Sequence, residues 1–155
     1  MKPQLLVSVV LGMASLAFPA LASDFTYSDL TGSWKVDAVA VPDEGVQALV
    51  DNDPQYMGAV IKFGPNDVTW IKGTETRPID PSIDNCDTAP SLTPWKADPN
   101  DSDQQPIKGG LSVMCGDDAW GTVVPVDDKT VKLHYLDNGV LTLTRQKANR
   151  PIPKP

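Results

Sequence analysis

The segment 30-LTGSWKVDAVAV-41 alternates apolar and polar side chains from Ser33 onward. A period of two is typical of a β-strand that buries one face. The side chains expected to share the inward face are those of Trp34, Val36, Ala38 and Ala40, and those expected to face solvent are Lys35 and Asp37. Pro42 is expected to end the strand, because it lacks an amide donor. The pattern therefore predicts a half-buried strand over Ser33–Val41.

The residues upstream of this strand have the features of a secretory signal peptide. Lys2 precedes an apolar run over Leu5–Ala17, and Ala20-Leu21-Ala22 provides small residues for cleavage. We expect cleavage after Ala22, which removes residues 1–22 and leaves a single domain over residues 23–155. The apolar run is too short for a membrane span. No cysteine follows the cleavage site to carry a lipid, so the expected location is periplasmic or secreted.

The 155-residue chain has a formal net charge of −7, and it is 41% hydrophobic and 21% charged. The acidic balance argues against binding to a phosphate backbone, so no nucleic-acid partner is expected. The apolar fraction suffices for one packed core, which excludes wholesale disorder. We expect a monomer without a membrane span.

A short amphipathic helix is expected directly after the first strand. The acidic pair Asp43-Glu44 favours a helix start. The apolar residues of one helix face are Val46, Leu49 and Val50. The turn-forming residues 51–54 are expected to end this helix.

Turn residues divide the remainder of the chain into short apolar segments that can pair as hairpins. Asp137-Asn138-Gly139 is the strongest signal, because Asn-Gly favours the tight turn of a two-residue hairpin. The expected pairs of arms are Met57–Phe63 with Val68–Lys72, Leu111–Cys115 with Ala119–Val126, and Lys129–Leu136 with Val140–Gln146. Pro125 is expected at a bulge or an edge position, because it cannot donate to a strand ladder.

These elements predict an all-β fold with one short helix. Short strands joined by tight turns favour an antiparallel, up-and-down β-barrel of about seven to eight strands. Closing the sheet into a barrel removes exposed edge strands. A small β-sandwich is the alternative arrangement.

Residues 73–110 form a long segment with six prolines and seven acidic residues. Segments of this length without regular structure are uncommon in compact domains and are often functional. The apolar residues that offer a covering strand are Ile83, Leu92 and Trp95. Residues 98–105 have no apolar side chain and residues 148–155 no periodic pattern, so both are expected to be loose.

Cys86 and Cys115 are the two cysteines of the chain. Two cysteines in an exported protein most simply form one disulfide, which would pin the long segment to the strand that holds Cys115. A metal site would need further ligands, and the one histidine, His134, lies far along the chain. We expect no metal and no cofactor.

Two short motifs resemble the lipocalin and wider calycin pattern. Gly32-Ser33-Trp34 opens the first strand, and Leu141-Thr142-Leu143-Thr144-Arg145 lies in the last one. In that family a Gly-x-Trp on the first strand packs under a basic residue from the last strand. The resemblance implies a lipocalin-like barrel in which Arg145 stacks on the Trp34 ring as a structural latch, a cation–π contact worth about 0.5–2 kcal/mol.

Aromatic side chains along the expected strands suggest a site for a small, largely apolar ligand. The residues expected to line it are Tyr56, Met57, Trp70, Trp120 and Tyr135, with Phe63 as a further candidate. Tyr56 and Met57 follow the expected helix, so we place them at the mouth. An eight-stranded barrel is only just wide enough for one small ligand, so the same side chains can equally fill a solid core.

A protein-binding module is the alternative function. An acidic segment over residues 73–110, displayed on a disulfide-stapled scaffold, suits an inhibitor or immunity protein. Its acids would enter the basic cleft of a periplasmic partner and accelerate association. An envelope-maintenance role without a ligand is a third hypothesis.

The other polar groups are expected to have structural roles. A calcium-loop pattern opens with Asp98, Asn100 and Ser102, but Asp103 and Gly109 replace the required glycine and glutamate. The acids that favour turn geometry, with no cleft between them, are Asp51, Asp53, Asp117, Asp118, Asp127 and Asp128. His134 is expected to face outward beside Lys132. Without a nucleophile motif, the chain is not expected to be an enzyme.

Overall fold

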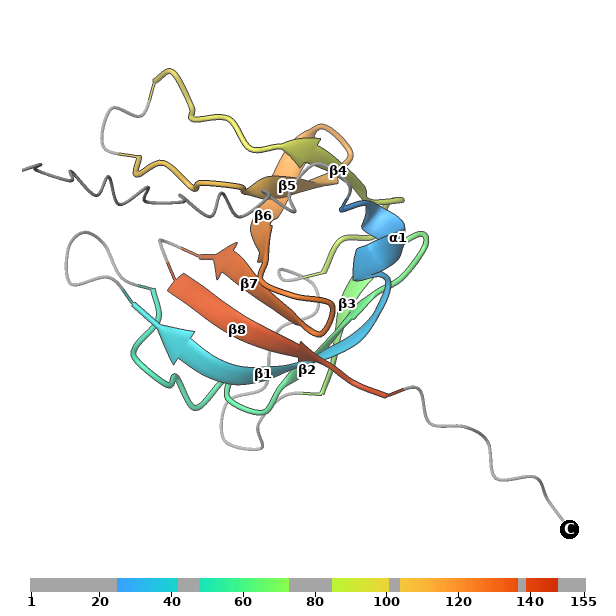
Figure 1. Ribbon diagram of the computed structural model, residues 1–155, viewed down its shortest axis with the longest axis vertical. Coiled ribbons are helices and arrows are strands. Elements are labelled where there is room, and N and C mark those ends of the chain that lie inside the picture. The colour runs from blue at the N-terminus through green and yellow to red at the C-terminus, as the bar shows by residue number, and fades with distance from the viewer. Residues whose placement is uncertain (1–24, 42–47, 73–84, 101–103, 137–138, 148–155) are drawn as a thin grey trace, which may run out of the picture.

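Figure 1 shows the computed structural model, which describes residues 25–41, 48–72, 85–100, 104–136 and 139–147. Its elements are α1 (Tyr27–Leu30), β1 (Gly32–Ala40), β2 (Val60–Phe63), β3 (Val68–Lys72), β4 (Ser91–Pro94), β5 (Leu111–Cys115), β6 (Asp118–Pro125), β7 (Thr130–Tyr135) and β8 (Gly139–Arg145). The expected signal peptide and residues 148–155 lie outside the described residues. Within the described part, no helix has both the length and the apolar character that crossing a membrane requires.

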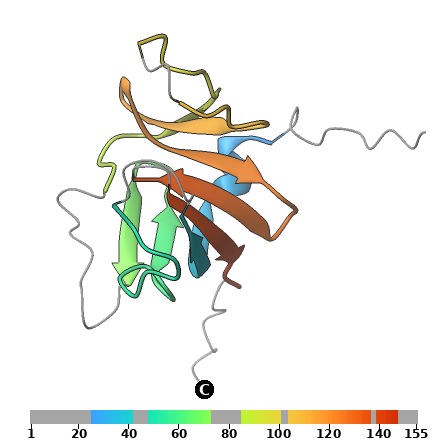
Figure 2. The same ribbon diagram turned by 90° about the vertical axis from the view of Figure 1, so that its left-hand side faces the viewer.

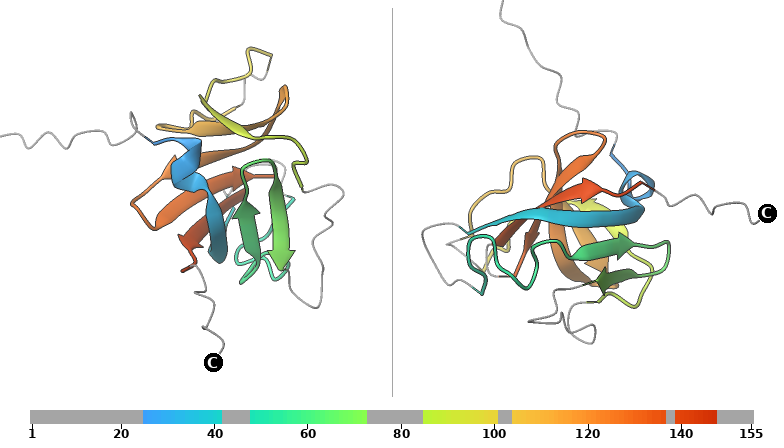
Figure 3. Two further views of the ribbon diagram at one scale, coloured as in Figure 1. Left: turned by 90° about the vertical axis from the view of Figure 1, so that its right-hand side faces the viewer. Right: turned by 90° about the horizontal axis from the view of Figure 1, so that it is seen from below.

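The eight strands form one antiparallel sheet in the order β3-β2-β1-β8-β7-β6-β5-β4. Strands that follow one another in the chain are neighbours in the sheet, except for β3 and β4, which form its two edges; β1 also pairs with β8. The sheet curls around its buried face into a half-barrel (Figures 2 and 3). The prediction of an all-β, up-and-down barrel architecture is therefore confirmed.

The first strand contains an irregularity that its sequence pattern did not indicate. Trp34 and Val36 are fully buried as expected. The pairing of β1 with β8 then shifts between Val36 and Ala38, so the alternation changes face. Val39 is buried in consequence, whereas Ala40 is exposed and Ala38 only half-buried. The predicted inward position of Ala40 is wrong.

The helix expected after β1 falls largely on residues 42–47, which lie outside the described residues. Residues 48–50 are described and are not helical. Leu49 is buried, whereas 58% of the Val50 surface is exposed, so the two side chains do not share a buried face. Instead α1 precedes β1, and the Asp29 carboxylate accepts a hydrogen bond from the Thr26 amide at its start. Four residues are too few to show a helical period.

The three expected hairpins are present, and β2 is the one strand whose start differs from its prediction by more than one residue. It begins at Val60 rather than Met57, because residues 53–58 form turns. The Tyr56 and Met57 amides both donate to the Asp53 carbonyl, and the buried Asp53 carboxylate accepts from Gln55. Such local bonds compete with strand pairing.

Pro125 occupies the last position of β6. It lies opposite Val131 of β7, whereas β5 ends its pairing with β6 at Val123. Pro125 therefore lies beyond the last residue that pairs with β5. At this position no hydrogen bond to β5 requires an amide donor.

Residues 85–94 span the space between the two edges of the sheet. Cys86 exchanges two backbone hydrogen bonds with Val68 at the start of β3, of 2.9 and 2.8 Å. The Trp70 amide donates to the Asn85 side chain. Eight residues after Cys86 the chain has passed through β4, which pairs with β5. Leu92 lies in this covering strand as expected; Trp95 follows it, and Ile83 lies outside the described residues.

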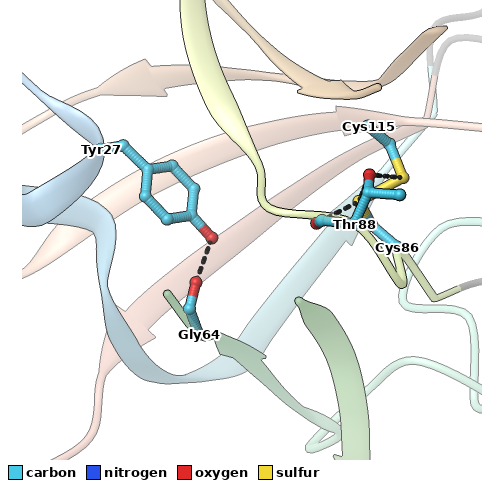
Figure 4. Close-up of a disulfide and its surroundings, with 5 residues drawn as sticks. All are labelled: Tyr27, Gly64, Cys86, Thr88 and Cys115. Carbon is cyan, nitrogen blue, oxygen red and sulfur yellow. Dashed lines mark hydrogen bonds between the residues drawn. A yellow bond between two sulfur atoms is a disulfide. The ribbon is translucent and has the colours of Figure 1, made fainter. Parts of the chain in front are cut away.

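The predicted disulfide between Cys86 and Cys115 is confirmed. It joins the residues beside β3 to the end of β5, with a Cα–Cα distance of 5.7 Å. The Thr88 hydroxyl lies 3.4 Å from the Cys115 sulfur (Figure 4). The disulfide therefore links the β3 edge of the half-barrel covalently to β5, the neighbour of the other edge strand β4.

Arg145 connects α1, β1 and β8. Its guanidinium carbon lies 4.3 Å from the centroid of the fully buried Trp34 ring. The same guanidinium donates hydrogen bonds to the carbonyls of Thr31 and Asp29. Gly32 has a φ of +131°, and a Cβ at that position would lie 3.3 Å from the Arg145 guanidinium, which explains the glycine.

Candidate binding site

The interior of the half-barrel holds a cluster of aromatic rings. Tyr135 lies at its centre, with ring centroids 5.0 Å from Trp120, 6.0 Å from Trp70 and 6.1 Å from Tyr56. The ring centroids of Tyr56 and Trp70 lie 5.4 Å apart, and those of Phe63 and Trp120 lie 6.2 Å apart. The structure thus brings together four of the five residues expected to line a ligand site.

The rings of this aromatic cluster are in direct contact with one another. Centroid separations of 5.0–6.2 Å and tilted or edge-to-face angles are those of packed aromatic pairs. Tyr56, Trp70 and Tyr135 are buried, and the half-buried Met57 and Trp120 pack against the same core. The sequence left open whether these side chains line a cavity or fill a core, and their contacts favour a filled core.

Two buried indoles differ in their hydrogen bonding. The Trp34 indole donates to the Leu30 carbonyl at 2.7 Å. The Trp70 indole nitrogen is the one buried side-chain polar atom of the described residues that has no hydrogen-bond partner. A buried donor without a partner loses its hydration and gains no bond in exchange.

We predict that this difference shows in a pair of matched substitutions. Trp34→Phe and Trp70→Phe remove the same atoms from buried sites, but only the first leaves a carbonyl without its donor. Trp34→Phe should therefore lower the free energy of unfolding by about 1–2 kcal/mol more than Trp70→Phe. Urea denaturation followed by far-UV circular dichroism measures both. Equal losses would show that the Trp34 hydrogen bond contributes nothing.

A cleft of about 560 Å³ lies between α1, β4 and the start of β5. Its lining residues are Phe25, Thr26, Tyr27, Pro90, Ser91, Leu92, Pro94 and Leu111. None of them is among the residues expected to bind a ligand. The lining comes from three segments far apart in the sequence, so no periodic pattern could reveal it.

Tyr27 fixes the wall of the cleft that α1 provides. Its hydroxyl donates to the Gly64 carbonyl in the turn between β2 and β3, at 2.8 Å (Figure 4). Burial, together with the negative charge of Asp67, raises the pKa of Tyr27 to about 12. The hydroxyl therefore remains a neutral donor at all physiological pH values, and it holds α1 against the sheet.

Comparison of the chain with protein-family models, curated proteins and solved structures gave no match. The half-barrel architecture therefore rests on the structure itself.

His134 lies on the face of β7 opposite the buried Val131 and Leu133. It is half-buried rather than solvated, which corrects the sequence expectation in part. Burial, and secondarily the charge of Lys132, lowers the pKa of His134. The described residues contain no group of three or more side chains suited to hold a metal ion.

The acidic residues of the described turns stabilise backbone geometry. Asp51 accepts a hydrogen bond from the Val41 amide, and Asp98 accepts one from the Asn100 amide. A hydrogen bond from the Lys129 amide holds the pKa of the Asp127 carboxyl below its usual range. Asp117, Asp118 and Asp128 are exposed. For the calcium-loop pattern, Ser102 and Asp103 lie outside the described residues.

The acidic segment over residues 73–110 is described only in part. Residues 73–84 and 101–103 lie outside the described residues. Between them, residues 96–100 are exposed. No contact of these residues favours a protein partner, so the protein-binding hypothesis stays a prediction.

Proposed function

We propose that the chain is an exported, lipocalin-like half-barrel that binds a small, largely apolar molecule in the cleft between α1, β4 and β5. The cleft is the single observation that carries this proposal. Its volume of about 560 Å³ falls in the range of small-molecule sites. Five of its eight lining residues are hydrophobic or proline without a polar group, and burial of apolar ligand surface supplies about 25 cal/mol per Å².

Polar atoms contribute a substantial share of the cleft surface beside its apolar residues. Thr26 and Ser91 contribute hydroxyls, and the Tyr27 hydroxyl is already bonded to Gly64. Polar groups in such a lining fix the orientation of a ligand, while burial of its apolar surface contributes affinity. The lipocalin-like assignment is supported by Trp34 and Arg145, which meet as the resemblance implies. Export is supported by the disulfide. No catalytic step is part of the proposal.

The proposal predicts that a bulky side chain in the cleft abolishes binding. Ser91 and Thr93 are both exposed residues of β4, but only Ser91 lines the cleft. In a fluorescence titration with N-phenyl-1-naphthylamine, the mature protein should show saturable binding. Ser91→Trp should weaken it at least about tenfold, since each 1.4 kcal/mol of lost contact is tenfold, whereas the matched Thr93→Trp should change it less than twofold.

Two results would contradict this proposal. One is the absence of saturable binding by the mature protein, and the other is equal weakening by Ser91→Trp and Thr93→Trp. Native mass spectrometry of the protein purified from its own host's periplasm then gives the mass of the natural ligand. A reproducible adduct that Ser91→Trp removes identifies the cleft as its site.

A further inference from the structure

The cleft has the surface chemistry of a groove for a polyproline II segment. Phe25 and Tyr27 provide aromatic rings on one side, and on the other Pro90 precedes β4 and Pro94 ends it. Grooves lined by aromatic residues recognise proline-rich peptides, because a polyproline II helix is stiff and presents its rings without internal hydrogen bonds. The cleft therefore suits a proline-rich segment as well as a small molecule.

The chain itself contains such a segment. Residues 148–155 read Ala-Asn-Arg-Pro-Ile-Pro-Lys-Pro, with prolines at positions 151, 153 and 155. Proline fixes its own φ near −65°, and it disfavours the helical region for the residue before it. Alternating prolines therefore favour an extended polyproline II conformation from Arg150 onward. Residues 148–155 lie outside the described part of the structure.

The described residues that precede this segment lie beside α1. Arg145 donates to the carbonyls of Thr31 and Asp29, and the Gln146 amide donates to the Ser33 carbonyl. From Ser33 back to Tyr27, residues 31–33 span at most about 10 Å at 3.3 Å per residue, and the four residues of α1 add about 6 Å at 1.5 Å per residue. Eight residues of polyproline II extend about 25 Å, at 3.1 Å per residue. The segment is therefore long enough to reach the cleft of its own molecule.

Two carboxylates beside the α1 wall of the cleft, those of Asp29 and Asp67, complement the cations of the segment; neither lines the cleft, and Arg145 places a positive charge near Asp29. Hydrogen bonds from Thr26 hold the pKa of the Asp29 carboxyl below its usual range, so Asp29 is anionic at neutral pH. Asp67 lies close enough to Tyr27 to affect its pKa. The segment contributes two cations, Arg150 and Lys154, within a chain of net charge −7. Opposite charges around an apolar groove favour one direction of docking.

We propose that residues 148–155 occupy the cleft of the same molecule and compete there with the small apolar ligand. This inference shares its cleft with the proposed function. The segment would act as an autoinhibitory occupant that the ligand displaces. A tethered segment is present at an effective concentration on the order of 1 mM. If the free peptide binds with a dissociation constant of about 0.1 mM, competition from the tethered segment raises the apparent dissociation constant of that peptide about tenfold.

The test uses the mature protein and a fluorescein-labelled peptide with the sequence of residues 147–155. Fluorescence polarisation should show weak peptide binding to the unmodified protein. The full-chain triple variant with Pro151→Ala, Pro153→Ala and Pro155→Ala should bind the peptide at least fivefold more tightly, because its own segment no longer competes. Pro99→Ala, an exposed proline outside the cleft, is the matched control and should behave as the unmodified protein. Ser91→Trp in the triple variant should abolish peptide binding.

Each remaining outcome separates this inference from the proposed function. If the triple variant binds N-phenyl-1-naphthylamine but not the peptide, the segment is not the occupant and the small-molecule site stands. If it binds neither, both proposals are wrong. Equal peptide binding by the triple variant and the unmodified protein overturns occupation by the molecule's own segment. A dimer in sedimentation that the triple substitution dissolves also overturns it, because the occupant then belongs to a second copy.

Discussion

Replacing Cys86 and Cys115 together with alanine is expected to lower the free energy of unfolding by about 3–4 kcal/mol. The disulfide closes a loop with a sequence separation of 29 residues, and the chain-entropy relation converts that length into this range. Among the described residues, the other bonds that tie the segment before β4 to β3 are the two hydrogen bonds between Cys86 and Val68 and the one from the Trp70 amide to Asn85.

Equilibrium urea denaturation of the double variant measures this loss, and hydrogen exchange locates it. Protection of the Val68 amide, which donates to the Cys86 carbonyl, should fall more than that of amides within β7 and β8. The unmodified protein in a reducing agent is the control and should lose the same stability, while the double variant should not respond to the reductant. A change below about 0.5 kcal/mol would show that the sheet edges hold together without the disulfide.

Arg145→Ala is expected to destabilise the protein by about 2–3 kcal/mol. The side chain covers the Trp34 ring at 4.3 Å, and a cation–π contact of this kind is worth about 0.5–2 kcal/mol. Its hydrogen bonds to the carbonyls of Thr31 and Asp29 add about 0.5–1.5 kcal/mol each, partly offset by water in the variant. Because these contacts hold α1 in place, the substitution should also weaken probe binding in the cleft.

Arg145→Lys separates charge from geometry in the same denaturation experiment. Lysine keeps the positive charge but cannot direct a planar fork at two carbonyls while it covers a ring. It should therefore recover less than half of the loss. Stability of Arg145→Ala within about 0.5 kcal/mol of the unmodified protein would contradict the structural role of Arg145. Full recovery by lysine would show that charge alone is needed.

Local sequence patterns were sufficient for most of the strands. The expected arms Val68–Lys72 and Leu111–Cys115 agree with β3 and β5, and the later strands differ from their predictions by single residues. Alternation and turn chemistry act between residues close in the chain, which is why one sequence window reveals them. The disulfide was also accessible, because a chain with two cysteines leaves one possible intramolecular pairing.

Features that depend on contacts between distant segments were not accessible in this way. The bulge in β1 arises from pairing with β8, so its own alternation wrongly placed Ala40 on the inward face. The start of β2 was missed because the buried Asp53 bonds its neighbours into turns. The residues expected to line a ligand site contact one another through their rings inside the half-barrel, and these contacts follow from the curl of the sheet.

The sequence by itself determined the all-β class, the hairpins and the disulfide. These depend on side-chain chemistry and spacing within a short window, or on a pairing with one candidate partner. The meeting of Trp34 with Arg145 was implied by the resemblance to the lipocalin pattern. Only the tertiary structure decided where a cleft exists. The cleft forms because α1, bonded through Tyr27 to Gly64, stands beside β4 without filling the space between them. Whether a cleft remains between packed elements depends on their relative positions, and these involve segments far apart in the sequence. No single segment therefore indicates it.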